Sequence, residues 1–304
     1  MLAWRKLTSS KWEDAWAESL AFLGGTRLAI TSVPGSRTIR LEAFALSKKE
    51  AALLTARFGG SVREARIRAA ASPPARRPIR IREKLAVAHS AKALAAARRA
   101  HPLREVILIP AGAAFGTGGH ATTSCCLRLL CDASGALQGR KWELLDLGTG
   151  SGVLAIAAAR LGAGRVEAWD FDRDAVRTAR ENARANGVSR IVVKKGDVLA
   201  PMSRRRWAVV SANLYSEVLI RASRRIAGAV KPGGWLILSG ILREQEAACA
   251  EAFETLGVKL EKRVHAGKWT TLLWRKPPRA AGGGSSLKTS RTGRKTIDAA
   301  GGAR

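Results

Sequence analysis

The sequence predicts an α/β protein whose larger part is a doubly wound, mostly parallel sheet. Strand-like and helix-like segments alternate over residues 105–258, and such alternation builds parallel strands joined by right-handed crossovers. Three glycines, Gly148, Gly150 and Gly152, stand between an apolar strand and a helical run. Asp170 ends the next expected strand about twenty residues later, the usual offset of an acid that binds a nucleotide ribose.

Each element of this larger part follows from its hydrophobic pattern. Strands are expected near 142–146, 165–170, 190–195, 207–212 and 234–239. Helices are expected near 121–132, 152–162, 173–186, 216–230 and 243–256. A hairpin of 258–264 and 269–274, turning at Gly267, is expected to close the sheet and to place one antiparallel strand in it.

The first seventy residues show a different order of elements. They predict a strand over 2–7, a helix over 11–23, a hairpin of 27–33 and 38–46, a helix over 48–57 and a strand over 61–68. Ser47 and Glu50 have the spacing of a capping box at the start of the second helix. The order β-α-β-β-α-β is that of a small ferredoxin-like α+β domain.

Composition divides the chain into four parts. We expect the ferredoxin-like domain over 1–71, a basic linker with a lead-in strand over 72–104, the doubly wound domain over 105–276 and a disordered basic tail over 277–304. The linker opens on a proline-rich, stiff segment, and strands are expected over 80–88 and 105–109. The tail is rich in Gly, Ala, Ser and Lys and buries too little apolar surface to fold.

The net charge of +29 indicates a polyanionic neighbourhood such as ribosomal RNA or a ribosomal assembly intermediate. Residues 57–104 carry thirteen Lys and Arg against two acids, and residues 277–304 carry six against one. An arginine-rich proteome with solvated charged faces would give the same balance. Charge alone therefore does not name a substrate.

Location and metal content follow from what the sequence lacks. It has no apolar run of membrane-spanning length and no signal-peptide pattern, so we expect a cytoplasmic protein with no membrane contact. The cysteines show neither C-x-x-C pairs nor histidines at ligand spacing, so we expect reduced thiols and no metal site. They are Cys125, Cys126, Cys131 and Cys249.

The glycine turn is the first candidate binding site. Glycine is needed where the backbone takes a positive φ or where a ligand must lie against it. Gly148, Gly150 and Gly152 form G-x-G-x-G, whereas dinucleotide sites use G-x-G-x-x-G. The turn resembles motif I of class I S-adenosylmethionine (SAM) methyltransferases; the alternative is a tight turn with packing glycines.

Asp170 is the second candidate, because a carboxylate there can accept hydrogen bonds from both hydroxyls of a ribose. Asp172 and Asp174 follow it and are assigned to capping the helix that starts near Arg173.

A loop before the first helix of this part and the end of the fourth strand complete the candidate site. Residues 115–123 form a Gly- and Thr-rich loop able to close over a ligand. His120 could line the pocket or fix the loop. Asn213 ends the fourth strand, at the edge where open α/β sheets bind ligands; it could instead cap the following helix, as could Ser216.

Five segments of the chain resemble the bacterial methyltransferases of large-subunit ribosomal protein eleven, the PrmA family. They are 114–123, 146–158, 169–172, 212–214 and 239–242. The resemblance spans residues 105–275 and implies a class I methyltransferase sheet, SAM as cofactor and methylation of amino groups on that ribosomal protein. It also implies a substrate-recognition role for the ferredoxin-like domain.

Site residues carry over from the family by motif position. SAM contacts would be Thr123, Gly148, Asp170 and Asn213, with Phe115, Thr117, Gly150 and Gly152 completing the cofactor loops. Gly119 and Ala121 depart from the family, which commonly has threonine and proline there.

Asn213 is the expected catalytic residue, because its side chain could accept a hydrogen bond from the substrate amine. We expect a monomer that uses its basic linker and tail for non-specific contact with rRNA. One alternative is a nucleic-acid methyltransferase, although Asn213-Leu214-Tyr215 lacks the prolines of the Asn-Pro-Pro-Tyr motif of such enzymes. The other is a SAM-binding ribosome-assembly factor without activity.

Overall fold

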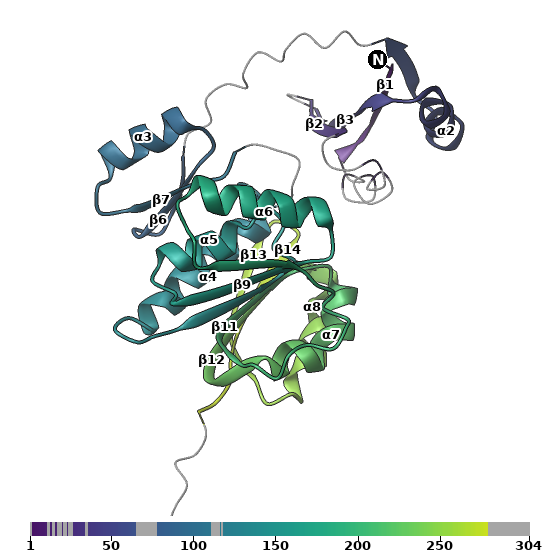
Figure 1. Ribbon diagram of the computed structural model, residues 1–304. Coiled ribbons are helices and arrows are strands. Elements are labelled where there is room, and N and C mark those ends of the chain that lie inside the picture. Colours follow the sequence, from purple (N-terminus) through teal and green to yellow (C-terminus); the bar gives the residue numbers. More distant parts are fainter. Residues whose placement is uncertain are drawn as a thin grey trace, which may run out of the picture.

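A computed structural model describes most of the chain and arranges it in three sheets (Figure 1). The described residues are 2–10, 13, 16, 20, 23, 27–33, 36–64, 78–110, 116 and 118–278. Most of the helix predicted over 11–23, the tail after residue 278, and the candidates Phe115 and Thr117 lie outside them.

The first sheet has the strand order expected of a ferredoxin-like domain. Its elements are β1 (Leu2–Ser9), β2 (Leu28–Ser32), β3 (Thr38–Leu46), α2 (Lys48–Phe58) and β4 (Ser61–Glu64). The order is β2-β3-β1-β4, and every neighbouring pair is antiparallel. The predicted capping box of α2 is confirmed, because Ser47 Oγ accepts from the Glu50 amide and the Glu50 carboxylate accepts from the Ser47 amide.

The segment expected to be a basic linker carries a small sheet of its own. It contains β5 (Ile79–Ile81), β6 (Leu85–Ala88), α3 (Ala91–Ala100) and β7 (Glu105–Leu108). The single strand predicted over 80–88 is wrong: β5 and β6 are antiparallel partners joined by a turn in which Arg82 takes a φ of 50°. An apolar pattern does not reveal a turn made by an ordinary residue in the left-handed region. The division of the chain into domains stays a prediction.

The central sheet has seven strands in the order β10-β9-β8-β11-β12-β14-β13. Its strands are β8 (Glu143–Leu147), β9 (Arg165–Asp170), β10 (Ile191–Lys195), β11 (Trp207–Asn213), β12 (Val230–Leu242), β13 (Lys259–Ala266) and β14 (Trp269–Arg275). Its helices are α4 (Ala121–Ala136), α5 (Val153–Arg160), α6 (Arg173–Ala185), α7 (Ser216–Gly228) and α8 (Glu246–Glu254), with a 3₁₀ turn, η3 (Arg243–Gln245), before α8.

The expected antiparallel strand is β14, which pairs antiparallel with both β12 and β13. Strands β8 to β12 are parallel. The chain reverses between β13 and β14 at Gly267, whose φ is +61°. This is the mostly parallel, class I methyltransferase sheet that the resemblance implied.

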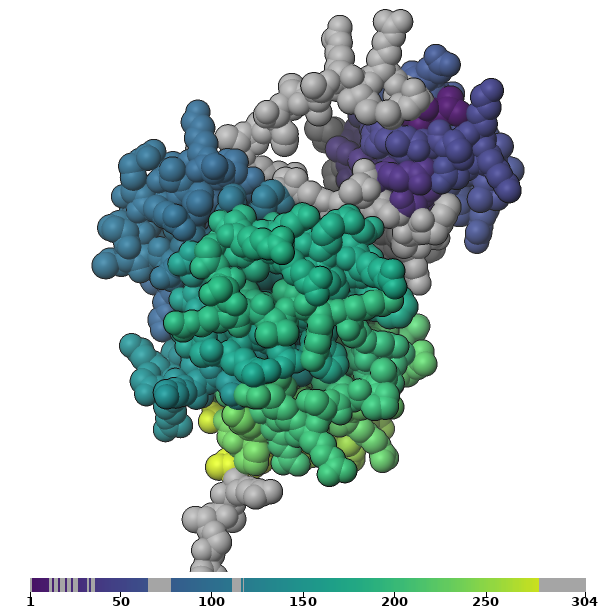
Figure 2. Space-filling model, viewed as in Figure 1, coloured from purple at the N-terminus to yellow at the C-terminus, as the bar shows by residue number. Residues whose placement is uncertain are grey.

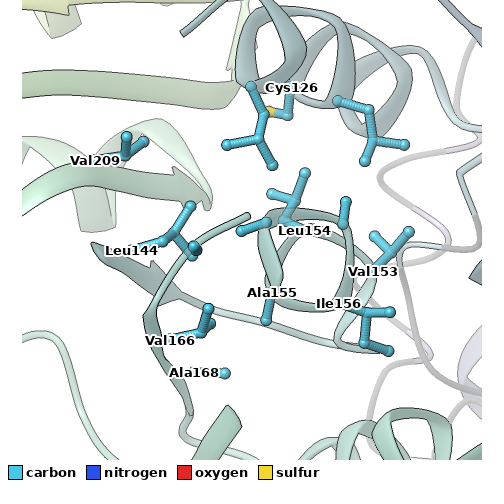
Figure 3. Close-up of a cluster of buried hydrophobic side chains, with 14 of the residues drawn as sticks. Cys126, Leu144, Val153, Leu154, Ala155, Ile156, Val166, Ala168 and Val209 are labelled. Carbon is cyan, nitrogen blue, oxygen red and sulfur yellow. The ribbon is translucent and has the colours of Figure 1, made fainter. Parts of the chain in front are cut away.

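Helices cover both faces of the central sheet, because its strands are apolar on both sides. Leu144 packs with α4 and α5, as Figure 3 shows with Cys126 and Leu154, whereas its neighbour Leu145 packs with α7 and α8 on the other face. Consecutive strand residues point to opposite faces, so one apolar pair serves both cores. Truncating either leucine to alanine would cost about 2–5 kcal/mol.

The small sheet β5-β6-β7 packs on the same core as α4 and α5. Ile81, Leu85 and Ile107 are fully buried in that cluster. The space-filling view shows the teal and green residues of the central sheet and its helices as one closely packed body (Figure 2). Residues 78–110 therefore support the central domain rather than merely connecting to it.

All four cysteines are buried and none is paired with another in the structure. Burial raises the pKa of Cys249 to about 12, so this thiol stays protonated. Within the described ranges, no helix combines the length and apolarity needed to span a membrane.

Candidate active site

The glycine turn links β8 to α5 in the way that its sequence predicts. Gly148, Gly150 and Gly152 have φ angles of +72°, +53° and +82°, which side-chain-bearing residues rarely adopt. The amides of Gly148 and Thr149 both donate to the carbonyl of Trp169 at 2.9 Å. The turn is thus fixed to the end of β9.

Gly148 also has no room for a side chain, because a residue at the end of a neighbouring strand packs against it. A Cβ on Gly148 would lie 2.3 Å from Leu214 Cδ2, far closer than van der Waals contact allows. Leu214 directly follows Asn213, the last residue of β11. The turn after β8 and the end of β11 are therefore packed together at the carboxyl edge of the sheet.

Asp170 lies at the end of β9, half-buried, and faces the glycine turn. Its Oδ2 accepts a hydrogen bond from the Gly150 amide at 2.8 Å, and its Oδ1 accepts from the Asp172 amide at 3.0 Å. Each carboxylate oxygen can accept more than one hydrogen bond. The carboxylate is therefore oriented by the backbone and can still accept ligand hydroxyls.

The two acids after Asp170 have different roles. Asp172 is the N-cap of α6, since its side chain accepts from the Asp174 amide at 2.9 Å, which confirms its assignment. Asp174 is not the side-chain cap: it lies in the first turn of α6, where negative charge near the positive end of the helix was expected, and its carboxylate pairs with Arg177 at 2.9 Å. Only the first position has the extended backbone that a cap requires.

Asp146 is a site residue to which the sequence analysis gave no role. It is 1% exposed, and its two oxygens accept hydrogen bonds from Thr149 and Ser211, each at 2.6 Å. Burial raises the pKa of this carboxyl to about 6, against the opposing effect of the two hydroxyls. Its position before the glycine turn was the available signal, but Ser211 comes from β11 and no local pattern points to it.

Asn213 reaches across to the start of α4. Its Nδ2 donates to Thr122 Oγ1 at 3.3 Å, and His120 Nδ1 lies 2.8 Å from the same hydroxyl. Asn213 does not cap α7, and neither does Ser216, which instead donates to Gln245 at 2.5 Å.

His120 and Thr123 lie on either side of Thr122 at the start of α4. The His120 ring packs edge-on against Trp269 with centroids 5.3 Å apart, and burial lowers its pKa. This contact supports the structural role of His120 over a pocket-lining one. The Thr123 hydroxyl is buried and has no hydrogen-bond partner among the described residues, which leaves it available to a ligand.

The loop before α4 is anchored to the glycine turn. Ser151 Oγ donates to the carbonyl of Gly116 at 2.7 Å. A Cβ on Gly116 would lie 3.3 Å from Ser151 Oγ. The structure thus brings Gly148, Gly150, Gly152, Asp170, Asn213 and Thr123 to one edge of the sheet. Phe115 and Thr117 are not among the described residues, so their roles stay predictions.

This geometry has a counterpart among known proteins. The family profile described as "Ribosomal protein L11 methyltransferase (PrmA)" matches residues 71–277. The chain belongs to this family. The match includes β5, β6, α3 and β7, which lie before the segments that carried the resemblance.

Individual relatives agree with the family assignment. A "Ribosomal protein L11 methyltransferase" of Citrifermentans bemidjiense is 45% identical over 176 residues, 57% of this chain and 56% of the relative. A protein of the same name from Geobacter sulfurreducens is 45% identical over 174 residues, with the same coverage. The chain thus spans about half the length of the curated relatives it matches.

A solved structure supports the fold. A ribosomal protein L11 methylase from Lactobacillus delbrueckii subsp. bulgaricus superposes with a TM-score of 0.56 at 26% identity, covering 66% of this chain and all of that one. The central sheet is therefore the sheet of a PrmA-family methyltransferase.

SAM is the cofactor of this family, and the residues at the carboxyl edge fit it. The three positive-φ glycines let the backbone of Gly148–Gly152 turn tightly beside Asp170, although Leu214 and Ala179 fill the positions that a Cβ on Gly148 or Gly152 would take. Asp170 offers two acceptor oxygens suited to a pair of ribose hydroxyls. Thr123 adds a buried hydroxyl that forms no hydrogen bond within the described part of the chain.

Proposed function

We propose that this protein transfers methyl groups from SAM to amino nitrogens of ribosomal protein L11. The observation that carries the proposal is the hydrogen bond between the Gly150 amide and Asp170, which holds a pair of acceptor oxygens beside the glycine turn. Family membership supports the reaction, and the names of the relatives supply the acceptor.

The residues divide into binding and positioning roles. Asp170 holds the ribose, the turn at Gly148–Gly152 accommodates the rest of the cofactor, and Asp146 fixes the turn through Thr149. Asn213 has its Nδ2 engaged with Thr122. That bond leaves Asn213 Oδ1 to accept a hydrogen bond from the incoming amine.

Bound SAM supplies an activated methyl group on a sulfonium, so the protein mainly provides a near-attack geometry. In the reaction the nitrogen lone pair forms the new N–C bond, the S–C bond breaks with its electrons leaving on sulfur, and the nitrogen loses a proton to solvent. The amine must first be neutral. Deprotonating a lysine at pH 7 costs about 4–5 kcal/mol, and an N-terminal amine costs only about 1 kcal/mol.

Further parts of the proposal concern location and partners. We place the protein in the cytoplasm as a monomer, with its basic 72–104 segment and tail contacting rRNA non-specifically. The excess of basic residues in both segments supports this contact.

The test is methyl incorporation from labelled SAM into three acceptor samples: purified ribosomal protein L11, naked rRNA and no added acceptor. The proposal predicts label in the protein, with mass spectrometry locating it on lysine side chains or the N-terminal amine. Label in RNA would instead indicate a nucleic-acid methyltransferase. SAM binding without transfer to either acceptor would indicate an assembly factor.

A further inference from the structure

A basic hollow lies at the edge of the central sheet opposite the candidate active site. It has a volume of about 280 Å³ and is lined by residues of the segment before β11 and of the last turn of α7, among them Arg204, Arg206 and Arg225. Strand β11 begins at Trp207, beside this hollow, and ends at Asn213. The hollow is therefore at the amino edge and does not belong to the cofactor site.

The arginines of the hollow have no acid partner in the part of the chain that the structure describes. Arg204, Arg206 and Arg225 are exposed, and their side chains form no ion pair or hydrogen bond with any described residue. The nearby acid Glu143 is already shared, with Arg205 and Lys231 each at 2.6 Å. These hydrogen bonds lower the pKa of Glu143 despite its partial burial, so it is ionised and fully engaged.

Lys276 adds a fourth cation to this edge. Strand β14 runs antiparallel to β12 and so ends where β12 begins, at the lower end of the sheet in Figure 1. The ammonium group of Lys276 donates a hydrogen bond to the carbonyl of Ala227 at 2.9 Å. Burial and the charge of Arg206 lower the pKa of Lys276. The folded chain thus brings Lys276 close enough to Arg206 for the two like charges to repel each other.

A second basic cleft in the described part of the chain differs in this respect. It is lined by arginines of the small sheet and α4, but Arg82 pairs with Asp132 at 2.9 Å and Arg104 pairs with Glu83 at 2.8 Å. Acids of the protein already balance much of its charge. Of the two hollows, the one at the amino edge is the one whose lining arginines have no acid partner among the described residues.

We propose that Arg204, Arg206, Arg225 and Lys276, here called the amino-edge cluster, bind the phosphates of an RNA backbone. Arginine presents a planar fork of donors that matches phosphate oxygens in pairs, and three of the four cations are arginines. The net charge of +29 draws a polyanion to the protein. The sequence after Pro278 contains further Lys and Arg. Binding here goes beyond methyl transfer, and only the choice of RNA over DNA rests on the proposed function.

The test compares two triple variants of the full chain that remove the same charge. R204Q/R206Q/R225Q neutralises the hollow, and R184Q/R190Q/K262Q neutralises three exposed cations elsewhere on the central domain. All six side chains are exposed, so both variants are expected to fold, which circular dichroism and thermal unfolding verify. Binding is followed by the anisotropy of a fluorescein-labelled oligouridylate at several salt concentrations.

The proposal predicts that the hollow variant binds the oligouridylate at least about tenfold more weakly than the control variant near 0.1 M salt. The slope of the logarithm of the binding constant against the logarithm of salt concentration should be smaller by about 2 in the hollow variant. Equal losses of affinity for the oligouridylate in both variants, or no binding of it by the unmodified protein, would overturn the proposal. Tighter binding of a matched oligodeoxythymidylate would overturn the assignment to RNA. Displacement by polyglutamate at equal charge concentration would point to an acidic protein instead.

Methyl transfer to free ribosomal protein L11 separates this proposal from the proposed function. The hollow variant should transfer methyl groups at the unmodified rate, because its substitutions lie at the opposite edge from Asp170. Loss of RNA binding with intact transfer supports the amino-edge cluster. Absence of transfer in the unmodified protein would refute the proposed function while leaving the RNA comparison decisive for the cluster.

Discussion

Asp170 and Gly150, twenty residues apart, are joined by a hydrogen bond of 2.8 Å from the glycine amide to the carboxylate. The bond makes the glycine turn and the end of β9 one unit, reinforced by the bonds from Gly148 and Thr149 to the Trp169 carbonyl. A change to either segment should therefore affect both halves of the cofactor site.

Replacing Gly148 with alanine should abolish SAM binding. An alanine here would need a φ near +72°, and its Cβ would clash with Leu214 Cδ2, so either the turn or the Leu214 side chain at the site edge must shift. Gly162→Ala is the matched control, because Gly162 has φ of +95° but open space around it. Backbone strain should lower the free energy of unfolding of both variants by about 1–3 kcal/mol. The additional clash with Leu214 should lower that of Gly148→Ala further. Urea unfolding and SAM calorimetry distinguish them; SAM binding by Gly148→Ala at the control's affinity would refute this packing.

The buried carboxyl of Asp146 should make stability depend on pH. Its pKa is raised from 3.8 to about 6, so the folded state holds the proton more tightly than the unfolded state does. This contribution is fully present below about pH 4 and is lost as pH rises through 6, a change of about 3 kcal/mol. Urea unfolding across this range should show the unmodified protein losing that stability relative to Asp146→Asn. A difference that is constant with pH would show that Asp146 does not titrate abnormally.

Asp172→Ala should weaken α6 by about 1 kcal/mol, because it removes the acceptor for the Asp174 amide. Asp174→Ala should cost less than about 0.5 kcal/mol, since its ion pair with Arg177 is exposed. Thermal unfolding of the two variants provides the comparison. Equal losses would mean that Asp172 is not the cap.

Asn213→Ala should lower kcat for methyl transfer about 5- to 150-fold, the loss expected for one hydrogen bond worth 1–3 kcal/mol. Ser216→Ala, three residues later, is the control, because its hydroxyl bonds Gln245 and not the site. Steady-state kinetics with ribosomal protein L11 measure the effect. If kcat is unchanged and only the KM for SAM rises, Asn213 binds cofactor without orienting the amine.

Local pattern was sufficient where local forces determine the structure. The Ser47 capping box, the positive-φ glycines and the alternation of apolar strands with helices all depend on neighbours within a few residues. The position of the candidate site at the carboxyl edge of the sheet could also be predicted, because parallel strands bring Asp170 and Asn213 to the same side.

Long-range contacts set the limit of prediction. Asp146 receives its second hydrogen bond from Ser211, which lies 65 residues away. The β5–β6 turn depends on a positive φ at Arg82, and no glycine or proline in that turn indicates it in the sequence. The amino-edge cluster exists only because β11, α7 and β14 meet at one edge, and its residues look like ordinary surface charge in the sequence.

The most direct measurement is isothermal titration of SAM into the unmodified protein and Asp170→Ala. The account predicts saturable binding to the unmodified protein and an affinity about 5- to 150-fold lower in the variant, from the loss of charge-assisted hydrogen bonds worth 1–3 kcal/mol. Equal affinity in the two proteins would contradict the assignment of Asp170 to the ribose. Absence of binding to the unmodified protein would contradict the SAM site as a whole.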